Sequence, residues 1–179
     1  LCKQGKGITL YSSFKQNLKG DKIYTVFEDS EGDEWILTNK GISIIGKKQV
    51  DSDFPFQYIK EADGIIYLVS QSDKLASYNF KTRQFKFIEI PYHVSMINEV
   101  KKFDSNTLLL ATDNGLIIYK IKEKEFQLID IRTSTQPSNV VQSVYQDHYK
   151  ELWIFPQTTG VIRYNPSTKE MQHLFTPAG

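Results

Sequence analysis

Five carboxylates gathered around one glycine form the densest set of chemically able side chains in the sequence: Glu28, Asp29, Glu31, Asp33 and Glu34. A calcium loop of the EF-hand type needs oxygen ligands at alternate positions and a glutamate at its twelfth position, but the twelfth residue counted from Asp29 is Lys40. Glycoside hydrolysis needs two carboxyl groups that face each other across a cleft, and nothing in the sequence sets a second carboxylate opposite this run. The pattern therefore predicts a solvated turn between two strands, whose glycine supplies the positive φ that such turns often use.

The remaining nucleophiles and metal-ligating side chains are scattered. His93, His148 and His173 are far apart and lack the spacing of metal ligands. Cys2 is the single cysteine, so no internal disulfide can form. We accordingly expect no catalytic residue, no metal and no cofactor in this chain.

The charge balance argues against a polyanionic partner. The 179 residues include 22 Lys plus Arg and 21 Asp plus Glu, which gives a net charge of +1. A protein that binds nucleic acid or an anionic membrane surface through its overall field needs a clear excess of basic residues. We therefore expect no nucleic-acid partner.

An internal repeat supplies the elements that would position these residues. Four apolar anchors, spaced roughly 40 residues apart, start similar segments: Val26, Ile59, Val100 and Val144. Each segment contains short apolar, β-branched runs bounded by turn sequences such as TDNG and NPSTKE. The aromatic content of 13% suits strands, and no stretch has a convincing helical period. Each repeat is therefore predicted to form four short strands joined by tight turns.

Aligned on these anchors, a large apolar residue recurs in the second predicted strand of each repeat. Trp35 and Trp153 occupy this position in the first and fourth repeats. Leu109 takes it in the third, and Tyr67 comes one residue early in the second. The tryptophans could serve as sugar-stacking platforms, but a repeated aromatic residue here is expected to pack between neighbouring repeats. Glycine then opens the third predicted strand in three repeats, at Gly41, Gly115 and Gly160.

Repeats of this length and strand content predict an all-β chain, a β-propeller segment of about four four-stranded blades plus a partial N-terminal blade. We place all of it in a single region, residues 1–179. The predicted boundaries are 1–16 for the partial blade and 17–52, 53–92, 93–134 and 135–176 for the four blades. Because propellers close into rings of roughly four to eight blades, we expect this region to be part of a larger ring. The alternative is a compact four-bladed ring with a loose N-terminal strand.

Two of the repeats resemble a known family. The run EDSEGDEWILTNKGI, residues 28–42, resembles the E-D-x-x-G-x-x-W-x-G-T-x-x-G-L repeat of the two-component regulator propellers. The run QDHYKELWIFPQTTGV, residues 146–161, is a second copy, and the lead-in NLKGDKIYTV, residues 17–26, is similar to the family's S-L-x-x-N-x-V. Leu37 and Phe155 depart from the pattern, because they stand where the family has a small glycine.

This resemblance implies the extracytoplasmic sensor region of a Bacteroides-type hybrid two-component system. Such propellers are non-catalytic and sense a ligand, usually an oligosaccharide, and the signal reaches a histidine kinase elsewhere in the parent chain. On this basis we expect a periplasmic location, as the extracytoplasmic part of an inner-membrane protein. The expected partners are an oligosaccharide, the remaining blades or domains of the parent protein, and a second copy in a homodimer.

The ligand is expected at one end of the blades, where the turns between second and third strands meet the connections to the next blade. We call this the loop end, and the opposite end the turn end. The loop end is rich in the amide, hydroxyl and aromatic groups that bind sugars, although surface loops are polar in any case. The candidate ligand-binding residues are Asn39, Gln71, Tyr92, His93, Asp113, Arg132 and Gln157.

Two other functions compete with ligand sensing. One is a propeller that serves only as a scaffold for protein–protein interaction. The other is a propeller hydrolase or lyase, which has less support because no set of carboxylates or metal ligands recurs among the repeats.

Overall fold

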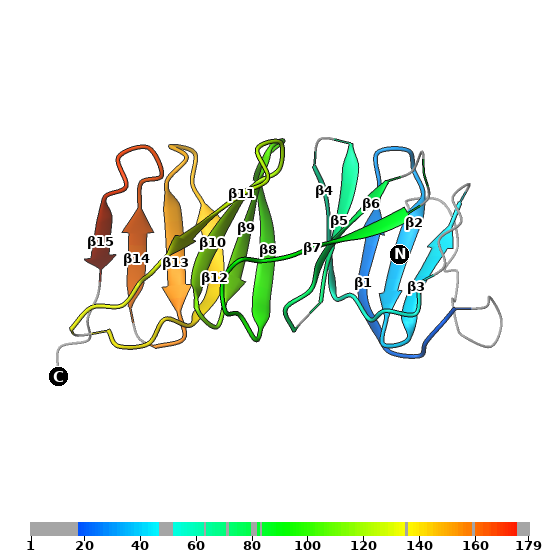
Figure 1. Cartoon of the computed structure of the whole chain (residues 1–179), viewed down its shortest axis with the longest axis horizontal. Coiled ribbons are helices and arrows are strands. Elements are labelled where there is room, and N and C mark those ends of the chain that lie inside the picture. The colour runs from blue at the N-terminus through cyan, green and yellow to red at the C-terminus, as the bar shows by residue number, and fades with distance from the viewer. Residues whose placement is uncertain are drawn as a thin grey trace, which may run out of the picture. The chain divides into compact units, whose positions relative to one another are not determined.

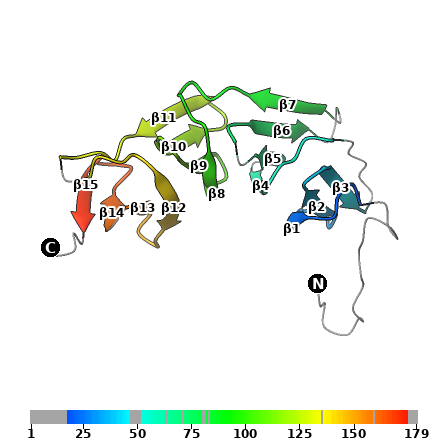
Figure 2. The same ribbon diagram turned by 90° about the horizontal axis from the view of Figure 1, so that it is seen from below.

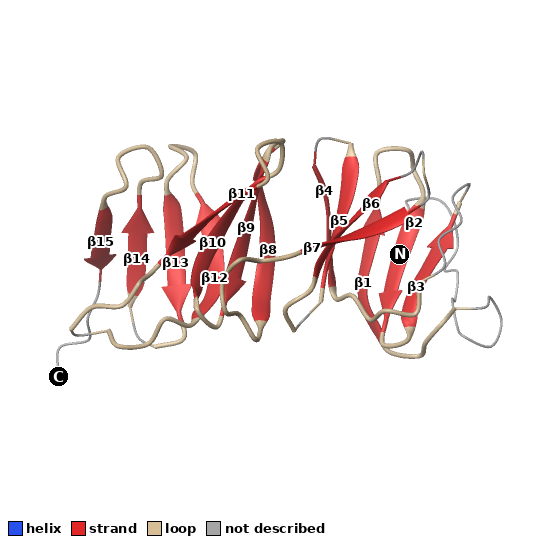
Figure 3. Ribbon diagram, viewed as in Figure 1, coloured by secondary structure: helices blue, strands red, loops and turns tan. Residues whose placement is uncertain are grey.

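The chain is all-β throughout the residues that the structure describes. The computed structural model describes residues 18–46, 52–62, 64–70, 72–79, 82, 84–134, 136–158 and 160–174. They contain fifteen strands in four antiparallel sheets (Figures 1 and 3), and no described residue is helical. The predicted all-β class is confirmed. The partial blade predicted for residues 1–16 lies outside the described residues.

The first compact unit, Leu1–Gln57, holds a three-stranded sheet. Its strands follow sequence order, β1 (Ile23–Glu28), β2 (Glu34–Thr38) and β3 (Gly41–Ile45). Where a fourth strand would pair with β3, the structure describes a single antiparallel bridge between Ile42 and Ser52. This repeat departs from the four-stranded expectation because the step from its anchor to the next one is the shortest in the chain.

The second compact unit, Tyr58–Gly179, holds three four-stranded sheets. The second sheet contains β4 (Tyr58–Ala62), β5 (Ile65–Val69), β6 (Leu75–Asn79) and β7 (Gln84–Ile88). The third sheet contains β8 (Ile97–Asp104), β9 (Thr107–Thr112), β10 (Gly115–Lys120) and β11 (Glu125–Ile129). The fourth sheet contains β12 (Val141–Gln146), β13 (Leu152–Pro156), β14 (Val161–Tyr164) and β15 (Met171–Leu174). Among the first strands, β4 contacts β8 and β8 contacts β12. Figure 2 shows the other strands of the second and third sheets leading outward from β4 and β8, as in propeller blades.

The repeat seen in the sequence has a structural counterpart in all four sheets. Each anchor lies in a first strand opposite an aliphatic residue of the second strand: Val26 opposite Ile36, Ile59 opposite Leu68, Val100 opposite Leu110, and Val144 opposite Ile154. The residues at the tryptophan position lie in the second strand next to these partners: Trp35, Tyr67, Leu109 and Trp153. Side chains alternate between the two sides of a sheet, so each sheet has an anchor face and a tryptophan face.

Inside the second unit, the tryptophan face of one sheet packs against the anchor face of the next. One apolar cluster joins Tyr67 of the second sheet to Val100 and Leu110 of the third. A second cluster joins Leu109 of the third sheet to Val144 of the fourth. Full burial of a side chain of this size contributes about 2 kcal/mol. The packing expected at the tryptophan position is therefore present at Tyr67 and Leu109.

Two glycines at the start of third strands are required by close backbone approach. Gly41 and Gly115 have φ values of 129° and 103°. A Cβ atom at Gly41 would lie 2.0 Å from the carbonyl oxygen of Ser52, and one at Gly115 would lie 2.6 Å from that of Ile129. Any side chain here would push the neighbouring chain segment away from the third strand.

Candidate functional site

Three predicted ligand-binding residues occupy one repeated position at the loop end. Asn39, Asp113 and Gln157 each directly follow the second strand of their sheet. Their backbone N–H groups donate to carbonyl oxygens just before the first strand: those of Lys22 at 3.0 Å, Met96 at 3.0 Å and Val140 at 2.9 Å. These bonds tie the lead-ins of the first, third and fourth sheets to the second–third turn of the same sheet, so these three turns are braced.

The side chains of two of these residues also brace the loops. Asn39 Oδ1 accepts a hydrogen bond from the backbone N–H of Lys22 at 3.2 Å. The Asp113 carboxylate accepts one from the N–H of Ser95 at 3.1 and 3.2 Å, through its two oxygens. Each still has lone pairs available, because a carboxylate or amide oxygen accepts more than one hydrogen bond.

An asparagine pair joins the loops around the third sheet. Asn114 Nδ2 donates to the carbonyl oxygen of His93 at 2.9 Å. Asn139 Nδ2 donates to Asn114 Oδ1 at 3.0 Å, and Asn139 Oδ1 accepts from the N–H of Ile131 at 2.9 Å. Sequence reasoning missed both asparagines, although each lies in a segment it singled out: the TDNG turn and the connection that ends at Asn139.

The other three described candidates differ in exposure and in the hydrogen bonds and ion pairs that their side chains form. Tyr92 is half-buried, and its hydroxyl donates to the carbonyl oxygen of Phe126 at 3.1 Å. His93 is exposed. Arg132 is exposed and forms a two-pronged ion pair with Asp130, with Nε–O distances of 3.0 and 3.1 Å. The hydrogen bond from the Arg132 side chain lowers the pKa of Asp130 from its ordinary value.

The structure brings only some of these candidates together. Tyr92, His93 and Asp113 lie on the loops of the third sheet, which the asparagine pair connects to the segment that carries Arg132. Gln157 belongs to the fourth sheet and Asn39 to the first unit. Gln71 lies outside the described residues. The ligand-binding role of all seven stays a prediction.

A buried donor that the sequence did not reveal lies in the connection between the third and fourth sheets. Gln136 is 8% exposed, and its Nε2 group has no hydrogen-bond partner within the described part of the chain. Its backbone is fixed by bonds to Thr133 in both directions, at 2.8 and 2.9 Å. A buried amide donor without a partner costs free energy, and because this atom is closed to solvent, a ligand or water molecule could reach it only after the connection rearranges.

At the turn end, the acidic run has a structural role that differs from the solvated turn predicted for it. Asp29 and Asp33 are buried, with exposures of 5% and 4%. Asp29 Oδ1 accepts from the N–H groups of Glu31 and Asp33 at 2.9 and 3.1 Å, and its Oδ2 accepts from the Trp35 indole at 2.8 Å. The expectation of a solvated turn is therefore wrong for these two carboxylates, because the indole and the turn amides replace water around Asp29. We call this arrangement the aspartate–tryptophan clasp.

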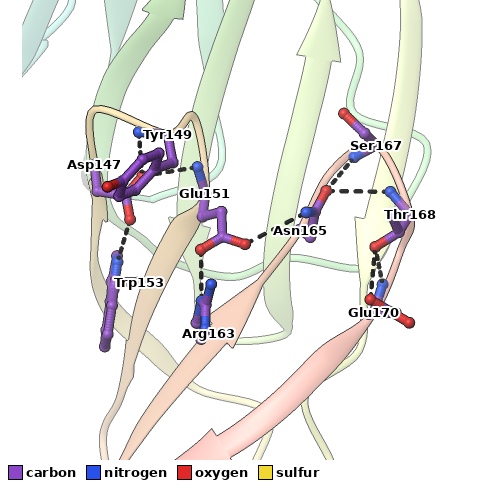
Figure 4. A network of polar contacts seen from close by, with 9 residues as sticks. All are labelled: Asp147, Tyr149, Glu151, Trp153, Arg163, Asn165, Ser167, Thr168 and Glu170. Carbon is purple, nitrogen blue, oxygen red and sulfur yellow. Dashed lines mark hydrogen bonds and ion pairs between the residues drawn. The ribbon is translucent and has the colours of Figure 1, made fainter.

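The fourth sheet repeats the clasp (Figure 4). Asp147 Oδ1 accepts from the N–H groups of Tyr149 and Glu151 at 2.9 and 3.0 Å, and its Oδ2 accepts from the Trp153 indole at 3.0 Å. The indole hydrogen bond lowers the pKa of Asp147, and the two turn amides and the charge of His148 lower it further.

Beside this clasp lies an open polar groove of about 370 Å³. It is lined by Glu151, Arg163, Asn165, Glu170, Met171 and Gln172. Arg163 Nε donates to Glu151 Oε2 at 2.5 Å, and Asn165 Nδ2 donates to Glu151 Oε1 at 3.4 Å (Figure 4). The polar groups of the groove therefore largely satisfy one another.

Among the residues that the structure describes, no group of three or more His, Cys, Asp or Glu side chains lies close enough to hold a metal ion. No helix in this part of the chain has the length and apolar character needed to cross a bilayer.

Repeated antiparallel sheets whose first strands contact each other and whose faces stack define a β-propeller arrangement. Known proteins share it. The extracellular domain of a hybrid two-component system from Bacteroides thetaiotaomicron superposes with a TM-score of 0.68 at 20% identity, over 89% of this chain and 22% of that chain. Catalytically inactive virginiamycin B lyase from Staphylococcus aureus superposes with a TM-score of 0.63 at 17% identity, over 90% of this chain and 58% of that chain.

In sequence, the chain is 22% identical over 156 residues to histidine kinase P4 of Formosa agariphila. The match spans 87% of this chain and 9% of that protein. No protein-family model matches the chain. The resemblance to the sensor regions of hybrid two-component systems is confirmed by these matches, and at such identities the solved structures establish a shared fold.

Proposed function

We propose that this chain forms part of a non-catalytic, extracytoplasmic sensing domain in a two-component signalling protein. Two likenesses support the proposal: the sequence match to a histidine kinase and the fold shared with the extracellular domain of a hybrid two-component system. The lyase that shares the fold is less similar in both sequence and structure. In this proposal the kinase lies elsewhere in the parent chain, on the other side of a membrane.

The ligand class that suits the loop end is an oligosaccharide. The observation that carries this choice is the exposed, planar guanidinium of Arg132, which the carboxylate of Asp130 holds in place. Exposed His93 and the braced Asp113 carboxylate add further donors and acceptors on neighbouring loops. Sugars are bound by planar polar groups of this kind held on a rigid frame.

The mechanism follows from the bracing of the loops. The second–third turns are tied to the lead-ins, and the connection after the third sheet is tied to β10 by the bond from the N–H of Gly115 to Asn139 O at 2.7 Å. A ligand that pulls on these loops would therefore change the packing between neighbouring sheets. The free energy available for signalling is limited to the difference in ligand affinity between the two packings.

Isothermal titration calorimetry of the chain against a panel of neutral and acidic oligosaccharides tests the proposal. We expect one class to bind, and the His93→Ala/Arg132→Ala double variant to lose about tenfold or more in affinity, the equivalent of about 1.4 kcal/mol. Glu170→Ala, an exposed change at the turn end, is the matched control and should bind like the unmodified chain.

Three results would overturn the proposal. An equal loss of affinity in Glu170→Ala would show that the ligand does not bind specifically at the loop end. Absence of binding to every oligosaccharide, with capture of a protein partner, would favour the scaffold. Turnover of a sugar would establish an enzyme.

A further inference from the structure

One residue breaks the pattern of the tryptophan position. An aromatic side chain occupies this position in three sheets, as Trp35, Tyr67 and Trp153, whereas the third sheet has Leu109. Leucine has no aromatic ring and takes up less volume. The third sheet therefore packs against the fourth with a smaller side chain at the point where the repeat places a large one.

The interface between the second and third sheets shows how an aromatic ring is used at this point. Tyr67 is 2% exposed, and its ring lies edge-on to the ring of Tyr119, with 6.4 Å between the centroids. Ile121, which directly follows the third strand of the third sheet, is also buried. All three side chains belong to one apolar cluster, so side-chain atoms fill this interface as far as the turn end.

A cleft of about 80 Å³ lies at the equivalent place between the third and fourth sheets. The buried part of its lining is aliphatic, with Leu109 and Ile118 from the third sheet and Leu152 from the fourth. Pro166, which corresponds to Ile121 in the repeat, also lines the cleft but is only half-buried. The sheet that lacks the ring is therefore the one with a cleft beside it. Both walls of this cleft belong to the second compact unit.

Lys120 supplies a positive charge at the exposed part of the cleft. It is exposed, and it is the one charged side chain among the described residues of the lining. Two carboxylates lie near it outside the cleft: Glu125 pairs with Lys120 across the strands, and Glu123 interacts with it electrostatically. Glu123 also accepts a hydrogen bond from Asn106 Nδ2 at 2.8 Å. The cleft itself thus carries a cation and no anion among its described lining residues.

Gln127 adds a polar group that spans the cleft. It lies on the fourth strand of the third sheet, opposite Ile118, and lines the cleft. Burial raises the pKa of Tyr164 in the fourth sheet, and a hydrogen bond with the Gln127 side chain lowers it. The Gln127 amide therefore links the two walls. Because an amide has two N–H donors, one of them is left for a ligand.

The size and the lining of the cleft restrict what it can hold. A water molecule occupies about 30 Å³ of the liquid, so the volume admits about three groups of methylene size. Aliphatic walls favour hydrocarbon over water, and an ammonium with an amide beside it favours a carboxylate. Small-molecule sites commonly combine apolar walls with a few polar groups in this way.

We propose that the cleft between the third and fourth sheets binds a short-chain carboxylate. A tail of about three carbons lies against Leu109, Ile118 and Leu152, and the carboxylate lies beside Lys120 and Gln127. This site goes beyond the proposed oligosaccharide sensing, because it lies at the turn end and shares no residue with the loop end. A ligand that contacts both sheets stabilises the packing in which the cleft exists.

Titration with butyrate, followed by methyl NMR, tests the proposal. The methyl signals of Leu109, Ile118 and Leu152 should shift together and saturate, whereas those of Ile36, which does not line the cleft, should stay in place. Two other ligands separate tail from charge. 1-Butanol keeps the tail without the charge, and acetate keeps the charge with a single methyl group. Each should bind about tenfold more weakly than butyrate or less.

Three variants assign the two parts of the site. Lys120→Met keeps the length of the side chain and removes its charge, so butyrate should lose about tenfold in affinity while 1-butanol is unaffected. Lys102→Met, an exposed change outside the cleft, is the matched control and should bind like the unmodified chain. Leu109→Trp restores the residue of the first and fourth sheets and should abolish binding of both ligands. Circular dichroism checks its fold.

Four results would overturn the proposal. Absence of a saturating shift at the cleft methyls would show that butyrate does not bind there. Equal affinity for butyrate and 1-butanol, or unchanged butyrate affinity in Lys120→Met, would exclude a carboxylate site. Unimpaired binding in folded Leu109→Trp would place the ligand elsewhere. The His93→Ala/Arg132→Ala variant should bind butyrate normally, so failure of the loop-end proposal is distinguished from failure of this one.

Discussion

The turn between β1 and β2 in the first sheet and the turn between β12 and β13 in the fourth sheet form the same hydrogen bonds, but their surroundings differ. In the first, the N–H of Asp29 donates to Asp33 O at 3.0 Å, and the N–H of Gly32 donates to Asp29 O at 3.0 Å. In the fourth, the N–H of Asp147 donates to Glu151 O at 3.0 Å, and the N–H of Lys150 donates to Asp147 O at 3.1 Å. The aspartate then binds two turn amides and an indole in both. Trp35 is fully buried, whereas Trp153 is only half-buried.

The comparison separates what local sequence decides from what packing decides. An aspartate followed six residues later by a tryptophan forms the same clasp in both environments, so the clasp is a property of the turn. Burial of the indole depends on what covers the tryptophan face, which the turn does not determine. Changes in turn geometry should therefore alter the free energy of unfolding similarly in the two turns, whereas loss of the carboxylate should alter it differently.

Loss of the carboxylate should have the largest effect and should separate the two turns. Asp29→Ala leaves two turn amides and a buried indole N–H without their acceptor. We expect it to lower the free energy of unfolding by about 3 kcal/mol, in the range of a buried hydrogen-bonded charge. Asp147→Ala should cost clearly less, because water can reach the half-buried Trp153. Urea unfolding followed by circular dichroism measures both.

A double change in each turn isolates the indole bond. Asp29→Ala combined with Trp35→Phe removes the indole donor together with its acceptor. Trp35→Phe by itself also leaves a cavity in a fully buried site, so the double variant should lose less free energy of unfolding than the sum of the two single variants, and the difference measures the indole bond. Equal losses in the single variants Asp29→Ala and Asp147→Ala would show that burial of the indole does not govern the strength of the clasp.

Much of the fold could be predicted because its determinants are local. The anchors, the turn glycines and the tryptophan positions all fall in register along the chain, and the sheets follow that register. The burial of Asp29 could not be predicted in this way. Its indole partner lies across a turn on the next strand, so an acidic run that appears solvated in sequence contains a carboxylate that the fold encloses.

The candidate site was less accessible to sequence reasoning for a related reason. Asn114 and Asn139 are 25 residues apart and meet only after the third sheet forms. The amide of Gln136 is buried, without a partner among the described residues, because of the path of a connection between sheets, and no periodicity encodes that path. The positions of Asn39 and Asp113 at the ends of second strands could be predicted, because strand ends recur at the same place in each repeat.

Turn geometry gives the second comparison, with a smaller expected effect. Gly32 and Lys150 occupy the same place in their turns, with φ values of 85° and 66°. A left-handed conformation costs a residue with a side chain about 1 kcal/mol relative to glycine. Lys150→Gly should therefore raise the free energy of unfolding by about 1 kcal/mol, and Gly32→Lys should lower it by a similar amount. A Cβ at Gly32 meets no atom within 4 Å, so the effect there is conformational alone.

Thermal unfolding of the two variants checks this comparison, and Lys150→Ala is the control. Alanine keeps the backbone strain and removes the charge, so its unfolding temperature should stay near that of the unmodified chain. A gain in Lys150→Ala as large as that in Lys150→Gly would assign the effect to charge.

Acidification should have the smallest effect, a local change in the turn between β12 and β13 of the fourth sheet. The indole hydrogen bond and the turn amides lower the pKa of Asp147. A carboxyl with a lowered folded-state pKa stabilises the fold above its ordinary pKa of about 3.9, and this contribution is lost as the pH falls through the lower folded value. In a Trp35→Phe background, the fluorescence of Trp153 should therefore stay constant from neutral pH to about 4 and change below it. Asp147→Asn should abolish that change, and a transition that persists in Asp147→Asn would assign it to another group, with the clasp left intact at low pH.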